Sequence, residues 1–237
     1  MESVLIEGSK TRFKDLQRNY SQNPKVITAN RFVGFGEEDN LDQILKETPI
    51  PVDFDFLSID DGNDYHVWKA ILKYKPKVVC IEFNPTIPTE IRFVQPPDFS
   101  VNQGSSLLSL VELGKEKGYE CVSVLPFNAF FVKSEYYPLF KINDNSPGIL
   151  RTNLDAVTYL FIGYDGKFFL HGCKKLLWHN IELKESKIQP LPRFLRKYPD
   201  YYSKVEKMMF AIYLLLSDPH TFMRIAKKVF NRLINRL

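Results

Sequence analysis

Short apolar runs alternate with amphipathic segments along the first half of the chain. Apolar stretches bounded by turn residues are typical of buried strands, and apolar spacings of three and four are typical of helices. The predicted strands are 4–7, 26–29, 54–60 and 77–83, and the predicted helices are 9–20, 41–47, 64–74 and 105–118. This alternation favours βαβ units and a mostly parallel sheet covered on both faces.

For two of these helices, individual residues predict the cap or the buried face. Ser9 is placed to cap the helix over 9–20, since a serine side chain accepts a hydrogen bond from a free N–H of the first turn. The helix over 64–74 is expected to turn a set of apolar side chains inward, namely Val67, Trp68, Ile71 and Leu72. Their spacing places them on one face of a helix.

The second half of the chain shows hairpin and linker patterns in place of the regular alternation. The short connection between 119–125 and 129–133 predicts an antiparallel hairpin at the end of the sheet, and 140–153 is polar and rich in turn residues, as linkers are. Asp165-Gly166 between two apolar runs predicts a second hairpin, and two helices are expected over 200–217 and 219–236. We therefore expect an α/β body over 1–140 and a small α+β extension over 150–237.

The positive charge of the chain is concentrated in its last part. The 237 residues carry a formal net charge of +4, whereas 201–237 alone carry seven cations and two acids. A nucleic-acid-binding domain would carry a basic face across its folded body, so nucleic acid is not expected as a partner. The last helix, with apolar residues along one stripe and cations opposite, either docks on its own protein or makes a peripheral membrane contact through 208–237.

The cysteines and the first residues indicate the compartment. Cys80 and Cys121 lie inside apolar strand-like runs, and the three cysteines show no metal-ligand spacing. The first residues have no signal-peptide pattern, and the longest apolar run, 208–216, is too short to span a bilayer. We expect a cytoplasmic protein, with the inner membrane surface as a further option.

Acidic residues close several of the predicted strands. Glu7, Asp60 and Glu82 each lie at or near a strand end, and the carboxyl ends of parallel strands form the rim where ligands bind. Asp60, Asp61 and Asp64 also crowd one turn, where their charges repel unless water, a metal, N–H groups or a ligand absorbs them. The alternative is structural: Gly62 supplies a positive φ, and Asn63 or Asp64 caps the next helix.

Four segments of the chain resemble the successive core motifs of one enzyme family. They are "DFLSIDDGNDYHVW", "VVCIEFNPTIP", "GSSLLSLVELGKEKGYECV" and "NAFFVK", and "GCKKLLWHN" and "LPRFLRKYP" follow later. These segments look like those of bacterial methyltransferase-like proteins akin to the FkbM-type S-adenosylmethionine-dependent enzymes. The resemblance covers about 4–140, with a C-terminal extension, and implies a Rossmann-like methyltransferase sheet that is mostly parallel and ends in an antiparallel hairpin.

The resemblance also implies roles for individual residues. The cofactor S-adenosylmethionine would be bound by Glu7, Gly8, Asn30 and Asn63, with Glu7 accepting hydrogen bonds from the ribose hydroxyls. Asp60, Asp61 and Asp64 would be the catalytic residues, one of them taking the proton of a saccharide or other polar hydroxyl acceptor. Asp60, Glu82 and Asn84 would form a hard oxygen site for Mg²⁺.

Two departures from the family pattern leave alternatives open. The turn is one residue shorter than the family's, which would reverse the direction of Asp60, because side chains alternate along a strand. The family's first strand and Gly-rich loop are also missing before residue 4, so we expect an N-terminally truncated sheet. Supply of the missing strand by another chain is a further option. The alternatives are a degenerate α/β module that binds a partner or a membrane, and metal-dependent nucleotide-sugar transfer.

Overall fold

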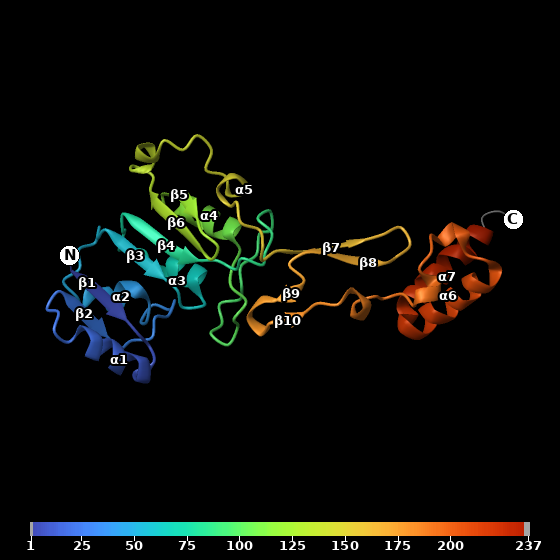
Figure 1. Ribbon diagram of the computed structural model, residues 1–237, viewed down its shortest axis with the longest axis horizontal. Coiled ribbons are helices and arrows are strands. Elements are labelled where there is room, and N and C mark those ends of the chain that lie inside the picture. The colour runs from blue at the N-terminus through green and yellow to red at the C-terminus, as the bar shows by residue number, and fades with distance from the viewer. Residues whose placement is uncertain (1, 235–237) are drawn as a thin grey trace. The chain divides into compact units, whose positions relative to one another are not determined.

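The computed structural model describes residues 2–234, with the backbone alone for 229, 230 and 232–234. The chain is of mixed α/β type and divides into two compact units, the first ending at Val157 and the second beginning at Thr158 (Figure 1). Each unit is described by itself.

The first unit alternates strands and helices, as its apolar pattern predicts. Its strands are β1 (Ser3–Ile6), β2 (Val26–Ala29), β3 (Phe56–Ile59), β4 (Val78–Glu82), β5 (Tyr119–Val124) and β6 (Asn128–Lys133). Its helices are α1 (Lys10–Tyr20), α2 (Leu41–Lys46), α3 (Asp64–Ala70), α4 (Leu107–Glu116), α5 (Pro147–Leu150) and the 3₁₀ turn η1 (Tyr137–Phe140). Ser9 caps α1 by accepting the Arg12 N–H, which confirms the predicted cap.

The strands of this unit do not form the single, mostly parallel sheet that the sequence predicts. β1 and β2 pair in parallel as a sheet of their own, and the larger sheet has the order β3-β4-β6-β5. Only β3 and β4 are parallel in the larger sheet, since β6 runs antiparallel to both β4 and β5. The predicted hairpin is confirmed, but among the described residues no strand joins β1 to β3, which leaves the parallel pairs in two sheets.

The main core lies on one face of the larger sheet. Trp68 of α3 packs against Phe131 of β6 and Tyr119 of β5, with ring centroids 4.9 and 5.8 Å apart. Leu110 of α4 is fully buried in the same cluster, to which α2 also contributes leucines. The three helices α2, α3 and α4 therefore bury their apolar faces in one core with this sheet.

The helix predicted over 64–74 ends four residues early. α3 stops at Ala70, and Leu72, expected to point inward, is 77% exposed. The carboxylate of Asp42 accepts the N–H groups of Leu72 and Lys73 at 2.7 and 2.8 Å and that of Tyr74 at 3.2 Å. These three donors bond to Asp42, in place of the helical carbonyls four residues earlier, so the chain leaves the helix here.

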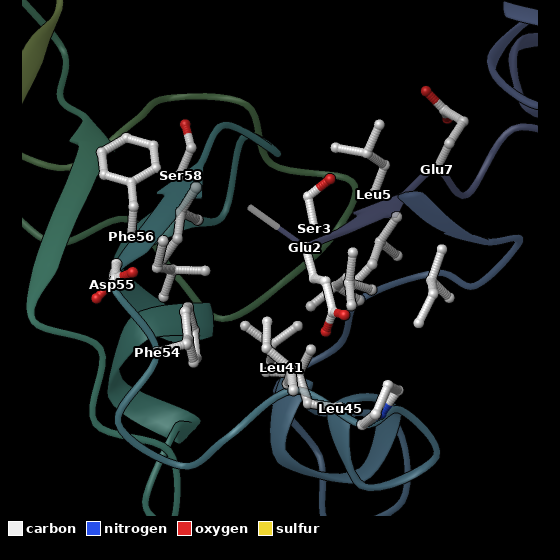
Figure 2. A pocket seen from close by; sticks show the side chains of 18 of the residues that line it. Glu2, Ser3, Leu5, Glu7, Leu41, Leu45, Phe54, Asp55, Phe56 and Ser58 are labelled. Atoms are coloured by element: carbon white, nitrogen blue, oxygen red, sulfur yellow. The ribbon is translucent and has the colours of Figure 1, made fainter. Parts of the chain in front are cut away.

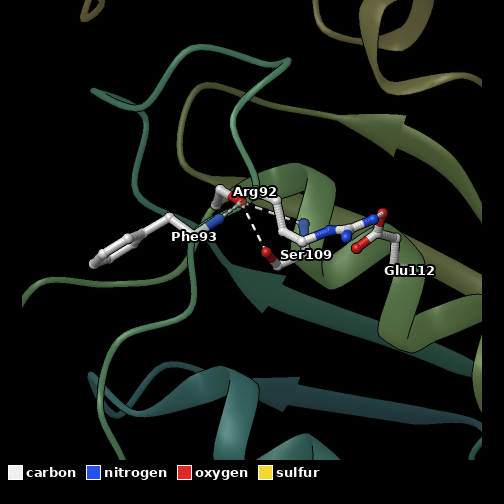
Figure 3. Close-up of polar contacts among 5 residues, drawn as sticks. Arg92, Phe93, Ser109 and Glu112 are labelled. Atoms are coloured by element: carbon white, nitrogen blue, oxygen red, sulfur yellow. Dashed lines mark hydrogen bonds and ion pairs between the residues drawn. The ribbon is translucent and has the colours of Figure 1, made fainter.

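A long loop connects β4 to α4, and a buried arginine outside the loop holds it, while an exposed arginine within it makes an ion pair. Arg151, buried within the segment predicted to be a linker, donates to the carbonyls of Pro85 and Ile87 at 2.5 and 2.7 Å. Arg92 forms an exposed ion pair with Glu112 of α4, and the next residue, Phe93, donates its N–H to the Ser106 hydroxyl at 3.0 Å (Figure 3). The segment 147–157 thus belongs to the first unit.

The second unit begins with the hairpin that Asp165-Gly166 predicts. Its strands are β7 (Thr158–Ile162), β8 (Phe168–Gly172), β9 (Lys175–Leu176) and β10 (Ile181–Glu182). The 3₁₀ turns η2 (Leu177–His179), η3 (Glu185–Lys187), η4 (Arg193–Leu195) and η5 (Pro199–Tyr201) follow, and then the helices α6 (Lys204–Ser217) and α7 (Pro219–Ile234). The antiparallel pairing of β7 and β8 confirms the predicted hairpin.

The two last helices carry exposed apolar side chains. Among the described ones, Met208, Ile212, Leu216 and Met223 are each at least half exposed. Of the apolar stripe predicted on the last helix, Phe222 is half-buried and Ile225 is exposed, and the side chains of Val229, Phe230, Leu233 and Leu237 lie outside the described residues. Within 2–234, no helix has both the length and the apolar character that a bilayer crossing requires.

Candidate functional site

A cavity of about 1270 Å³ opens between β1 and β3, and we call it the slot. Figure 2 shows Ser3 and Leu5 of β1 on one side of it and Phe56 and Ser58 of β3 on the other. The slot is also lined by residues from α2, α1 and the segment that leads into β3.

Three of the predicted acidic residues line this one cavity. They are Glu7, which follows β1, and Asp60 and Asp61, which follow β3. The sequence predicts that acids at the strand ends share a rim, and the structure brings these three to the same hollow. Asp60 lines the slot despite the shortened turn, so the predicted reversal does not take it away from this cavity.

Glu7 also has a structural contact. Its Oε1 accepts the backbone N–H of Ser9 at 2.7 Å, at the start of α1. The side chain of Asn30 donates to the carbonyls of Glu7 and Gly8 at 2.7 and 3.3 Å. Asn30 therefore holds the turn that presents the Glu7 carboxylate, so its amide acts on the β1–α1 connection.

The acidic turn after β3 is closed by its own backbone. Gly62 has a φ of +85°, the left-handed conformation that the sequence predicts for it. The Asp61 carboxylate accepts the Asn63 N–H at 2.8 Å, and the Asp64 carboxylate accepts the Asp61 N–H at 3.2 Å. Asn63 is the N-cap residue of α3, as predicted, but its side chain accepts no hydrogen bond from the first turn of the helix.

Gln95 fastens this turn to the long loop, a role that the sequence does not reveal. Its side-chain amide donates to the Gly62 carbonyl and to the Asn63 side-chain oxygen, both at 2.7 Å. Its oxygen accepts the N–H groups of Gln103 and Gly104 at 3.0 and 2.6 Å. The Gln95 and Asn63 side chains are both buried, so Asn63, expected on the cofactor, is turned to Gln95.

Crowding of carboxylates shifts several pKa values in this region. Burial, with the Asp61 charge second, raises the pKa of Asp64 to about 7. Burial also raises the pKa of Glu82 to about 7, reinforced by a hydrogen bond and the charge of Asp60. Surrounding protein atoms desolvate the Asp61 carboxylate and raise its pKa, although the residue as a whole is exposed, and the Asn63 N–H lowers this pKa. A carboxylate with a raised pKa is a stronger base than a free one.

The three acids of the turn differ in what they can reach. Asp60 and Asp61 are exposed and line the slot, whereas Asp64 is 8% exposed and bonds back to the turn. Asp61 is therefore placed to meet a ligand in the slot, and Asp64 is placed to position Asp61.

The residues predicted to bind Mg²⁺ are engaged with one another or with the loop. Asp60 acts on Glu82, whose pKa it helps to raise, and the Asn84 side-chain oxygen accepts the N–H and hydroxyl of Thr86 at 2.9 and 2.7 Å. The Asn84 amide donates to the Gln103 carbonyl at 2.6 Å. Within the described part of the chain, no three His, Cys, Asp or Glu side chains are grouped as metal ligands. The magnesium site therefore stays a prediction.

Comparisons with known proteins do not place the chain in a family. No family model matches it, and neither a curated protein nor a solved structure is significantly similar to it.

Proposed function

We propose that the first unit is a methyltransferase-like module that binds S-adenosylmethionine at the acidic end of the slot and methylates a polar hydroxyl acceptor such as a saccharide. The observation that carries this proposal is the presence of Glu7, Asp60 and Asp61 around one cavity, each within two residues of the end of a strand in a parallel pair. Ligands of open α/β sheets bind at such strand ends. The motif resemblance of 4–140 points to the same cofactor.

Each residue has a role suited to its position. Glu7 accepts hydrogen bonds from the ribose hydroxyls, because its Oε1 is anchored on Ser9 and its carboxylate offers more than one acceptor site. Asp61, whose pKa is raised, takes the proton of the acceptor hydroxyl. S-adenosylmethionine, when bound, supplies the methyl group that this hydroxyl oxygen receives. Asp64 positions Asp61 through its bond to the Asp61 N–H.

The proposal is tested by calorimetric titration of the chain with S-adenosylmethionine. We expect saturable heat and an affinity about tenfold or more lower in Glu7→Gln, since hydrogen bonds to a charged group contribute about 1.5–3 kcal/mol. Glu2→Gln is the matched control, because Glu2 lines the same cavity from the other end of β1. An absence of saturable heat, or an equal loss in both variants, contradicts the proposal.

The separation of β1-β2 from the larger sheet favours a second function. β1 and β3 each have only one strand partner among the described residues, as in a module that recognises another polypeptide without methyl transfer. An absence of heat with S-adenosylmethionine would favour this alternative, whereas pairing of a peptide with the strand edges is compatible with either function.

A further inference from the structure

We infer that the slot between β1 and β3 is a binding site for an extended polypeptide strand, apolar at alternate positions and cationic near its ends. Such a strand would pair with both free edges and join the two sheets. This inference rests on the edges and the lining of the slot, and it does not depend on methyl transfer.

Two rows of backbone groups face the slot. The N–H groups of Ser3 and Glu7 donate to the carbonyls of Lys25 and Ala29, on the β2 side, at 2.9 and 3.0 Å. Backbone groups alternate in direction along a strand, so Val4 and Ile6 direct their N–H and C=O groups to the other edge of β1, which faces the slot. On β3, the Asp55 carbonyl accepts the Val78 N–H at 3.0 Å.

By the same alternation, Phe56 and Ser58 turn their backbone groups away from β4 and toward the slot. Unpaired strand edges are templates for strand addition, and natural proteins usually cover or charge them. A single added strand would satisfy both rows of backbone groups at once.

The two faces of the slot differ, which sets the pattern of the occupant. One face is apolar and continues the core, with Val4, Ile6 and Leu57 packed against it and Leu41 and Leu45 behind them. The opposite face of the slot carries the side chains of Ser3 and Leu5 from β1 and of Phe56 and Ser58 from β3 (Figure 2). Phe56 is 53% exposed. A strand that alternates apolar and small polar side chains would match both sides.

The charge of the lining favours cations at the ends of the occupant. Six acids border the slot, namely Glu2, Glu7, Asp53, Asp55, Asp60 and Asp61. Three cations border it as well, Arg12, Lys25 and Lys77, and Lys77 pairs with Asp55 at 2.7 Å. All six acids lie outside the bounds of β1 and β3, so they meet the ends of an added strand and not its middle.

The test uses the full chain and a fluorescent peptide, Lys-Val-Thr-Val-Ser-Val-Lys, followed by fluorescence anisotropy. We expect saturable binding that weakens about tenfold or more when the three valine nitrogens are methylated, because this removes one row of donors and keeps the side chains. Replacing both lysines of the peptide by aspartate is expected to weaken binding as well.

Hydrogen exchange read at single amides locates the peptide. Protection is expected at Val4, Ile6, Phe56 and Ser58 and not at Phe130, which already pairs within the larger sheet. Equal affinity of the methylated peptide, absence of saturation, or protection confined to other segments overturns the inference. Protection of the same amides without peptide, together with a dimer in sedimentation, would show that a second copy of this chain occupies the slot and would also overturn it.

Discussion

Asp64 is the buried acid of the turn after β3, and its surroundings set how stability depends on pH. Burial and the Asp61 charge raise its pKa from 3.8 to about 7, and Glu82 is shifted in the same direction. The folded state therefore holds protons that the unfolded state releases near pH 4. The contribution of these two acids to stability therefore falls as the pH rises from about 4 to about 7 and then levels off.

Asp64→Asn is expected to remove the Asp64 part of this fall. The amide imitates the protonated acid, and its oxygen can still accept the Asp61 N–H. At pH 8 the variant should exceed the native chain in free energy of unfolding by roughly 2–4 kcal/mol, and at pH 4 by little. Urea denaturation at both pH values measures the difference, with the exposed Asp53→Asn as control. A variant less stable than the native chain at pH 8 would refute this account of Asp64.

Gln95 gives a second test at the scale of one side chain. Gln95→Ala leaves the donors and acceptors around the turn without their buried partner, so we expect a loss of about 2–4 kcal/mol in the free energy of unfolding. Gln103→Ala is the matched control, since the Gln103 side chain is exposed and only its backbone holds the loop. Its expected change is within about 0.5 kcal/mol. Similar losses in both variants would contradict the role given to Gln95.

Sequence reasoning predicts single residues well when their partners are local. The cap by Ser9 and the positive φ of Gly62 follow from neighbours within three residues, and both are confirmed. The bond between Gln95 and Asn63 joins positions 32 residues apart, and no local pattern marks it. The burial of Leu72 was predicted wrongly for the same reason, because Asp42, 30 residues earlier, ends the helix.

At the scale of elements, the long loop between β4 and α4 is held mainly from one buried position. Arg151 donates to Pro85, Ile87 and Thr89, and its guanidinium lies 5.2 Å from the Phe83 ring centroid. Its segment has the polar, turn-rich composition of a linker, so the sequence favours a linker there. Composition describes the local chain, whereas this anchoring depends on carbonyls more than 60 residues away.

Arg151→Met is expected to destabilise the first unit by about 2–4 kcal/mol, because buried carbonyls lose their donors. Arg92→Met is the control, since the Arg92 side chain is 71% exposed in its ion pair with Glu112. Exposed pairs contribute about 0–1 kcal/mol, so this change should be small. Thermal unfolding of both variants compares them directly. Equal effects would mean that the loop is not held from Arg151.

At the scale of the whole molecule, the chain has two units of different character. The first contains the core, the slot and the acidic turn, and the second ends in α6 and α7 with exposed apolar side chains. The sequence predicts the order of strands and helices, both hairpins and the basic tail. It does not predict the separation into two parallel pairs, because pairing between strands far apart in sequence leaves no local signal.

The basic last helix leads to a prediction about lipid surfaces. We expect the chain to cosediment with vesicles containing phosphatidylserine, and less so at high salt. Lys227→Glu with Lys228→Glu should weaken this binding about tenfold or more, since each cation near an anionic surface contributes about 1 kcal/mol. Lys10→Glu with Lys14→Glu, on the exposed side of α1, is the matched control. Equal loss in both double variants would exclude a specific role for α7.

In the proposed function, Glu7 and the turn after β3 face one nucleoside-like ligand. Ultraviolet crosslinking of tritiated S-adenosylmethionine to the full chain, followed by peptide mapping, tests it most directly. We predict label in the peptides that contain 2–12 and 56–64, lost on adding excess unlabelled cofactor and reduced in Glu7→Gln but not in Glu2→Gln. Absence of any label that excess unlabelled cofactor removes would contradict this placement of the ligand, and so would label confined to 158–237.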